Sequence, residues 1–168
     1  MHMTDGFTIR PAEDRDLDAI LAIHNEQIRN STAIWTDQEA DRAEREAWLA
    51  DRHAAGHPVI VADIDGVAVG YASYGQWRPK IGYRQTVENS VYIDTEHRGQ
   101  GIGRALMVAL IDEARVRGMH VMVAGIDASN DTSIRLHESL GFSRAGLFPE
   151  VGRKFDRWLD LAILQLNL

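Results

Sequence analysis

A glycine-rich run, Arg98-Gly99-Gln100-Gly101-Ile102-Gly103, lies between a segment typical of a strand and a segment typical of a helix. Residues 88–93 before it are rich in β-branched and aromatic side chains, and the apolar residues after it recur at helical spacing. Free N–H groups and the positive dipole end make a helix start attractive to phosphate, and glycines allow a close approach. The run therefore predicts a site for a phosphorylated cofactor, with a turn that binds no ligand as the alternative.

The spacing of this run separates it from two other phosphate-binding loops. A dinucleotide fold places G-x-G-x-x-G after its first strand, with an acidic residue about 20 positions later. A P-loop requires a Lys-Ser or Lys-Thr pair after its glycines, and none follows here. The Arg-x-x-Gly-x-Gly form after a mid-chain strand resembles the pyrophosphate loop of the GNAT superfamily of N-acetyltransferases, which bind acetyl-CoA.

Composition narrows the classes of function. The 168 residues suffice for a single domain, here 1–168, and the net charge of −7 argues against a nucleic-acid partner. The absence of cysteine excludes disulfides, thiolate metal sites and a covalent acyl-cysteine intermediate. No apolar run has the length of a membrane span and the start lacks a signal-peptide core, so we expect a cytoplasmic protein without a membrane partner.

The pattern along the chain predicts a mixed α/β (α+β) fold in the order β-α-α-β-β-β-α-β-α-β-β. Asp65-Gly66 between two apolar runs is the strongest hairpin signal. Asp14 or Asp16 is expected to cap a helix whose apolar face is Leu17, Ile20, Leu21, His24 and Ile28. The other elements are expected as strands at 7–10, 59–62, 67–74, 86–93, 119–126 and 159–166, with one more strand before the last, and helices at 40–55, 102–117 and 130–140.

Three further segments extend the resemblance over nearly the whole chain. Residues 130–142, Asn-Asp-Thr-Ser-Ile-Arg-Leu-His-Glu-Ser-Leu-Gly-Phe, resemble the second signature of the superfamily. Residues 71–79 and 83–92, with 151–158 near the C-terminus, closely resemble the phosphinothricin and methionine sulfoximine N-acetyltransferases. The resemblance implies the GNAT acyl-CoA N-acyltransferase fold, a mixed and mostly antiparallel sheet with helices on both faces.

The resemblance also implies catalytic roles. Direct transfer needs a base for the amine, a donor for the oxyanion and an acid for the departing thiolate. Glu88 is implied as the base, acting through a water, where an isolated strand Glu would be a surface residue. His137 stands where many members have Tyr, so it is a candidate acid, with a simply packed histidine as the alternative. The phenol of Tyr92 is a second candidate donor, and the sequence does not choose among His137, Tyr92 and water.

Acetyl-CoA is the expected co-substrate. Backbone N–H groups from Gly99 to Arg104 would bind the pyrophosphate, and the main chain of 91–93 would pair with the pantetheine arm. Asn130 would bind that arm or cap a helix, or do both. The full expected set is Val91, Tyr92, Ile93, Arg98, Gly99, Gln100, Gly101, Ile102, Gly103, Arg104, Asn130 and Ser133.

The acceptor is expected to be a small amino-acid analogue acetylated on its α-amine. Arg suits its anionic end because the guanidinium pairs bidentately with oxyanions, and Arg78 is the first candidate although a lone Arg is usually solvated. Relatives are usually dimers, so Lys154 and Phe155 would reach the pocket of the same or a partner subunit of a homodimer. The expected substrate-binding residues are Arg78, Pro79, Lys80, Tyr83, Arg84, Glu88, Asn89, Ser90, Lys154 and Phe155.

The tryptophans and the remaining histidines are expected to be structural, and two other functions remain open. Trp35, Trp48 and Trp158 are expected in the core or at an interface. No metal site is expected, because His53, His57, His97 and His120 lack ligand spacing. Two other functions remain possible: a protein N-terminal or ribosomal-protein acetyltransferase, and a CoA-binding sensor without turnover.

Overall fold

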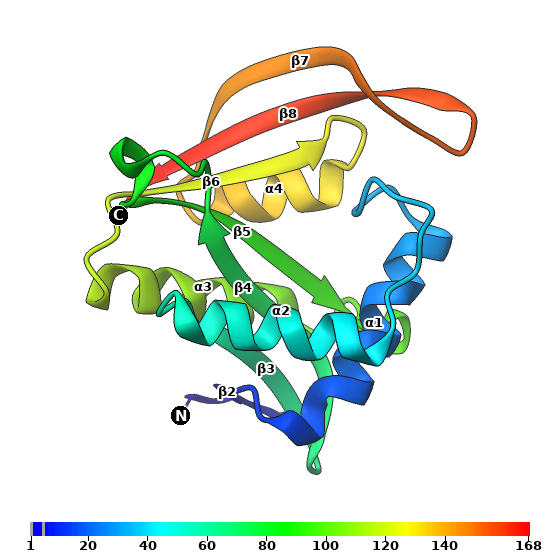
Figure 1. The fold of residues 1–168 in the computed structure, drawn as a ribbon, viewed down its shortest axis with the longest axis vertical. Coiled ribbons are helices and arrows are strands. Elements are labelled where there is room, and N and C mark those ends of the chain that lie inside the picture. The colour runs from blue at the N-terminus through cyan, green and yellow to red at the C-terminus, as the bar shows by residue number, and fades with distance from the viewer. Residues whose placement is uncertain (1, 5) are drawn as a thin grey trace.

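The computed structural model describes residues 2–4 and 6–168, and these residues form an eight-stranded sheet between two layers of helices (Figure 1). The strand order is β1-β2-β3-β4-β5-β6-β8-β7. All neighbouring strands run antiparallel except β5 and β6, which are parallel. The elements are β1 (His2–Thr4), β2 (Phe7–Pro11), α1 (Leu17–Asn30), α2 (Arg42–Ala54), β3 (Val59–Ile64), β4 (Val67–Gln76), β5 (Thr86–Ile93), α3 (Ile102–Val116), β6 (Val121–Asp127), α4 (Asp131–Ser139), β7 (Ser143–Lys154) and β8 (Arg157–Asn167).

The predicted fold class and element order are confirmed, with β1 as an additional strand. The predicted hairpin at Asp65-Gly66 joins β3 to β4, and both residues have positive φ, 52° and 87°. This is the backbone that a two-residue hairpin turn requires. The strand expected at 119–126 begins later, at Val121, because the N–H of Met119 is bonded to Ala114 O at the end of α3.

Side chains of the sheet alternate between two apolar layers. Tyr71 of β4 packs in the cluster under α1 and α2, whereas Ala72 and Tyr74 pack in the cluster under α3 and α4. In α1 the buried face includes Ile23 and Gln27, while the predicted Leu21 and His24 are only partly buried. The helical period was predicted correctly, and Leu17, Ile20 and Ile28 are buried as expected. The buried face is rotated toward Ile23 and Gln27 and away from Leu21 and His24.

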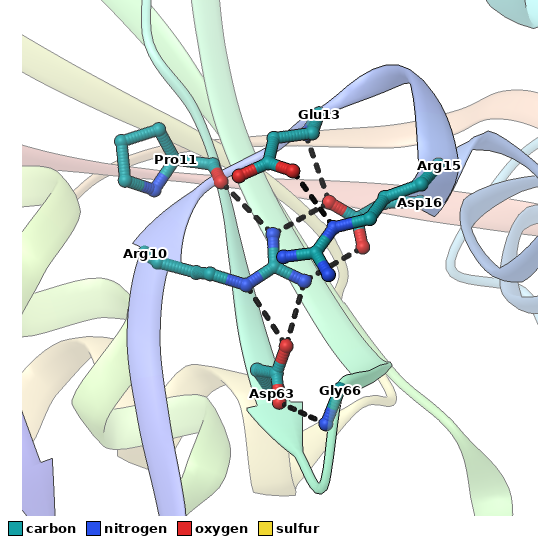
Figure 2. A network of polar contacts seen from close by, with 7 residues as sticks. All are labelled: Arg10, Pro11, Glu13, Arg15, Asp16, Asp63 and Gly66. Carbon is teal, nitrogen blue, oxygen red and sulfur yellow. Dashed lines mark hydrogen bonds and ion pairs between the residues drawn. The ribbon is translucent and has the colours of Figure 1, made fainter.

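One buried ion-pair network connects β2, the start of α1 and the β3–β4 turn (Figure 2). Arg10 donates two hydrogen bonds to Asp16, at 2.7 and 2.8 Å, and two to Asp63, at 2.8 and 2.7 Å. Asp16 also accepts from Glu13 N, and Asp63 from Gly66 N in the turn. Burial alone would raise the pKa of Asp16, but the hydrogen bonds from Arg10 and Glu13 outweigh it, and the pKa is lowered.

Replacing Arg10 should therefore destabilise the fold. Arg10→Met leaves the carboxylate of Asp16, 2% exposed, without its cation. Loss of one partner of a buried pair typically costs about 3–5 kcal/mol. Denaturant unfolding at pH 7 measures this loss, and Arg15→Met, which removes the exposed pair with Glu13, should cost less than about 1 kcal/mol.

The difference in free energy of unfolding between the wild type and Arg10→Met should also depend on pH. Because the pKa of Asp16 is lowered below its usual 3.8, the stabilisation is present above that pH. It is lost as the pH falls through the folded-state pKa. A stability difference that stays constant into strong acid would contradict the assignment to Asp16.

Candidate active site

The glycine-rich run forms a loop at the entry to α3, as the sequence predicts. Gly99 and Gly101 have φ of 76° and 79°, and Gly101 is the N-cap of α3, which begins at Ile102. Added Cβ atoms at Gly99 and Gly101 would meet no described atom within 4 Å, so the backbone here faces open space. Arg98, the first residue of the run, forms an ion pair in which its Nη2 lies 3.6 Å from Glu26 Oε2. The loop can therefore offer main-chain N–H groups to an anion.

A cavity of about 460 Å³ opens where β5 and β6 separate. Within the described residues, β5 pairs with β6 only at Thr86, Val87 and Glu88. Beyond that point the facing edges of residues 89–93 and 125–127 line the cavity. Buried backbone N–H and C=O groups need partners, so this gap can receive an extended polar chain between the strands.

The walls of this first cavity bring together most of the residues predicted to bind the cofactor. Those that line it are Val91, Tyr92, Ile93, Arg98, Gly99, Gly101, Ile102, Gly103, Asn130 and Ser133, together with Asn89, Ser90 and His137. Arg104 instead donates to Ser139 Oγ at 2.8 Å, and Gln100 is exposed outside the lining. Asn130 Oδ1 accepts from Ser133 N, which makes it the N-cap of α4.

A second cavity, of about 390 Å³, adjoins the first. Ala33 and Gly125 line both, so the two cavities meet at these two small residues. The second cavity also contains Glu88 and Arg78, and its remaining walls are Trp35, Trp77, Phe148, Leu161 and Ile163. A carboxylate and a guanidinium thus share an otherwise largely apolar and aromatic chamber, an arrangement suited to a small zwitterion.

Glu88 lies near the junction of the cavities. Its Oε1 is 3.4 Å from the position that a Cβ at Gly125 would occupy, and its side chain remains open to solvent. Desolvation by the surrounding protein raises the pKa of Glu88, and the positive charge of Arg78 opposes that rise. A carboxylate with a raised pKa is a better proton acceptor than an ordinary surface Glu.

Arg78 is held over an aromatic ring. Its Cζ lies 4.7 Å from the ring centroid of Trp77, and the ring of Tyr83 meets Trp77 edge-on at 5.5 Å. The stacking orients the guanidinium while leaving its N–H groups available. Pro79, Lys80, Tyr83 and Arg84 continue the same loop, are exposed, and line neither of the two cavities described here.

His137 is buried on α4 and lies beside Asn89 of β5. Its Nδ1–H donates to Ser133 O at 2.7 Å, and its Nε2 lies 3.2 Å from Asn89 Oδ1. Desolvation lowers the pKa of His137, and its bond to Ser133 O opposes this only partly. The imidazole is therefore neutral at pH 7 and carries its single proton on Nδ1, so Nε2 has no hydrogen to donate to Asn89 Oδ1.

Tyr92 is on the opposite side of β5 from Asn89. Its ring packs 5.4 Å from that of Tyr71, under α1 and α2. Desolvation raises the pKa of Tyr92, so the phenol keeps its proton at neutral pH. It lines the first cavity, where a retained proton is available to a developing anion.

Several wall residues carried no usable sequence signal. The segment between α1 and α2 supplies Ser31, Ala33 and Trp35 to the walls, although Trp35 was expected in the core or at an interface. Thr32 Oγ1 is bonded to Asp127 Oδ2 at the end of β6. Gly125 and Phe148 likewise contribute through tertiary placement, which no local pattern announces.

Lys154 and Phe155 lie at the end of the β7–β8 hairpin. The Lys154 ammonium is buried and donates to Ser31 O and Ile34 O, both at 2.6 Å, while the Phe155 ring is exposed. Neither residue lines the two cavities described.

Two negative findings apply to residues 2–4 and 6–168. No three His, Cys, Asp or Glu side chains gather there as a metal site would require. None of the helices in that part of the chain has the length and apolar character to cross a membrane.

The profile of the Acetyltransferase (GNAT) family matches residues 20–142. Over 96% of its length the chain is 52% identical to the L-methionine sulfoximine/L-methionine sulfone acetyltransferase of Pseudomonas aeruginosa, of which the match covers 94%. It is 39% identical to the phosphinothricin N-acetyltransferase of Alcaligenes faecalis, with 96% of the chain and 82% of that protein covered.

Among solved structures, that of yncA from Salmonella typhimurium with its cofactor acetyl-CoA superimposes with a TM-score of 0.95 at 50% identity. The match covers 97% of this chain and 94% of that one. The glycine loop before α3, the opened β5–β6 pair and these matches agree: the chain belongs to the GNAT family and is an N-acetyltransferase.

Proposed function

We propose that this enzyme transfers the acetyl group of acetyl-CoA to the α-amine of a small amino-acid analogue of the methionine sulfoximine, methionine sulfone or phosphinothricin type. The observation that carries the proposal is the second cavity, in which Glu88 and Arg78 face a chamber that joins the first cavity at Ala33 and Gly125. The names of the relatives that match nearly the whole chain support this acceptor class. We also propose a cytoplasmic location, where acetyl-CoA would be available to the enzyme.

The first cavity is the proposed acetyl-CoA site. The main chain of Gly99–Arg104 would hold the pyrophosphate, with Gln100 and Arg104 contributing N–H groups and Arg98 adding charge. The open edge of Val91, Tyr92 and Ile93 would pair with the pantetheine arm, and Asn130 with Ser133 would close its far side. The positive φ of Gly99 and Gly101, with no atom where a Cβ would stand, supports this fit.

The proposed chemistry is direct transfer in a ternary complex. Glu88 takes the proton of the acceptor ammonium, through a water, and the free amine attacks the thioester carbonyl. A backbone N–H within 91–93 binds the oxyanion, which collapses to expel the thiolate. Tyr92, which keeps its proton, donates it to the thiolate, and the nitrogen of the new amide releases its second proton, which returns through water to the Tyr92 phenolate. The neutral His137 packs beside Asn89.

Arg78 is the proposed anchor for the anionic end of the acceptor. Trp77 holds its guanidinium by stacking, and Glu88 lines the same cavity. Ser90 and Asn89 line the neighbouring cavity within reach of the reacting end. Pro79, Lys80, Tyr83 and Arg84 would shape the mouth of the site as parts of the same exposed loop.

An acceptor panel tests this proposal. Release of CoA thiol from acetyl-CoA should be fast with methionine sulfoximine, methionine sulfone or phosphinothricin, and weak with a short peptide. Because the chain has no cysteine, its own thiols add no background to the assay. Turnover with the peptide alone would move the function to protein acetylation. Acetyl-CoA binding without any turnover would make the protein a sensor.

Glu88→Gln tests the base. Removal of a positioned general base should lower kcat by about 100-fold or more, with acetyl-CoA binding by calorimetry unchanged. Because the pKa of Glu88 is raised above its usual 4.5, the wild-type kcat/KM should fall as the pH drops through that raised value. The variant should lack this acid limb. Glu138→Gln, on the surface of α4, is the matched control, and equal losses in both variants would remove Glu88 from the mechanism.

We further propose a homodimer that covers the exposed apolar side chains of the β7–β8 hairpin. Leu147, Val151, Phe155 and Trp158 are each more than half exposed, at 55%, 56%, 54% and 59%. So many large apolar groups on one hairpin are unusual for a monomer surface. Light scattering at micromolar concentration should give twice the chain mass of 18.8 kDa, and Val151→Glu should halve it. A wild-type monomer would contradict the proposal.

A further inference from the structure

The segment that follows α1 reaches across to the β7–β8 hairpin, at the opposite end of the sheet order from β1 (Figure 1). Residues 31–36 of this segment contain no helix or strand, yet they contribute Ala33 to both cavities and Trp35 to the second. A wall built from an irregular segment depends on contacts outside that segment for its position.

Two residues of β7 supply such contacts. Lys154 is 6% exposed, and its ammonium donates to the carbonyl oxygens of Ser31 and Ile34, on either side of Ala33. Gly152 lies against the ring of Trp35 so closely that a Cβ there would stand 2.1 Å from Trp35 Cε3. A third contact, from Thr32 to Asp127 of β6, holds the other side of the segment.

The chemistry of Lys154 fits anchoring better than capture of a mobile ligand. Its ammonium has two backbone acceptors at 2.6 Å, and the Phe155 ring centroid lies 4.9 Å from it. Desolvation lowers its pKa, with Asp37 opposing the shift. A buried ammonium with two of its three donors used by the backbone has only one left to offer a substrate anion.

We propose that Lys154 is a positioning residue of the acceptor site: with Gly152 it clamps residues 31–36 so that Ala33 and Trp35 form a wall of the second cavity. Trp35 then becomes a specificity-determining residue, which contacts the side chain of the acceptor. This inference rests on the proposed function only for the identity of the acceptor. The clamp itself is a contact within one chain.

Steady-state kinetics test the clamp. Lys154→Met should raise the KM for methionine sulfoximine about tenfold, the scale of a lost contact in an apolar pocket, while kcat and the KM for acetyl-CoA change less than about twofold. Gly152→Ala keeps Lys154 but displaces Trp35, so it should raise the same KM. Arg153→Met, an exposed neighbour on the same strand, is the control and should leave all constants unchanged.

A double-mutant cycle separates positioning from direct binding. If Lys154 acts through Trp35, Lys154→Met should add less than about twofold to KM in a Trp35→Ala background. If Lys154 touches the acceptor itself, the two effects on KM should multiply, and the proposal would be overturned. A fall in kcat without a change in KM would overturn it as well.

A labelling experiment that does not depend on turnover tests the clamp separately from the proposed function. The chain has two lysines, Lys80 and Lys154, so reductive methylation followed by mass spectrometry reports each one. Exposed Lys80 should react at least about tenfold faster than the clamped Lys154, because the buried ammonium is shielded from reagent. Equal rates would overturn the clamp. A wild type inactive toward every amino acid would defeat the proposed function but not the clamp, which the labelling ratio tests alone.

Discussion

The separation of β5 from β6 after Glu88 is the constraint on which the site depends. Parallel strands that continued side by side would satisfy each other's backbone groups and leave no room for a ligand. Here three paired residues hold the strands together, and the following residues of each strand line a cavity instead. The same divergence places Glu88 at the last paired position, where its carboxylate is held by regular structure yet faces the opening. The placement of Glu88, the proposed base, and the binding gap therefore have one structural origin.

The two faces of β5 place different side chains around that gap. Asn89 faces α4, where its Oδ1 lies 3.2 Å from Nε2 of His137, whereas Tyr92 packs under α1 and α2 against Tyr71. Because alternate residues of a strand point to opposite faces, this division follows from the strand itself. Burial favours the uncharged form of both titratable groups: it lowers the pKa of the histidine and raises the pKa of the phenol. Of these two groups, the histidine has its one proton committed to a backbone carbonyl, whereas the phenol lines the first cavity with its proton retained.

Much of the fold was predictable from sequence because its signals are local. The bounds of β5 were predicted at Thr86 and Ile93, the Asp65-Gly66 turn was identified, and the glycine loop entered α3 at Ile102 as expected. The cofactor side of the site follows from that loop and strand. The acceptor side does not, because Ala33, Gly125 and Phe148 come from three distant parts of the chain. Trp35 was expected in the core or at an interface for the same reason: its role is set by Gly152 and Lys154, more than 100 positions away.

The pairing of the strands affects how cooperatively the sheet can unfold. Strands β1 to β5 form one antiparallel block and β6, β8 and β7 another, and within the described residues only Thr86, Val87 and Glu88 join them by backbone pairing with β6. A molecule that lies in the gap and forms hydrogen bonds to both facing strand edges would connect the two blocks beyond these three paired residues. Since a ligand that binds only the folded state stabilises it in proportion to the logarithm of its concentration, cellular acetyl-CoA would set how firmly the two blocks of this enzyme are joined.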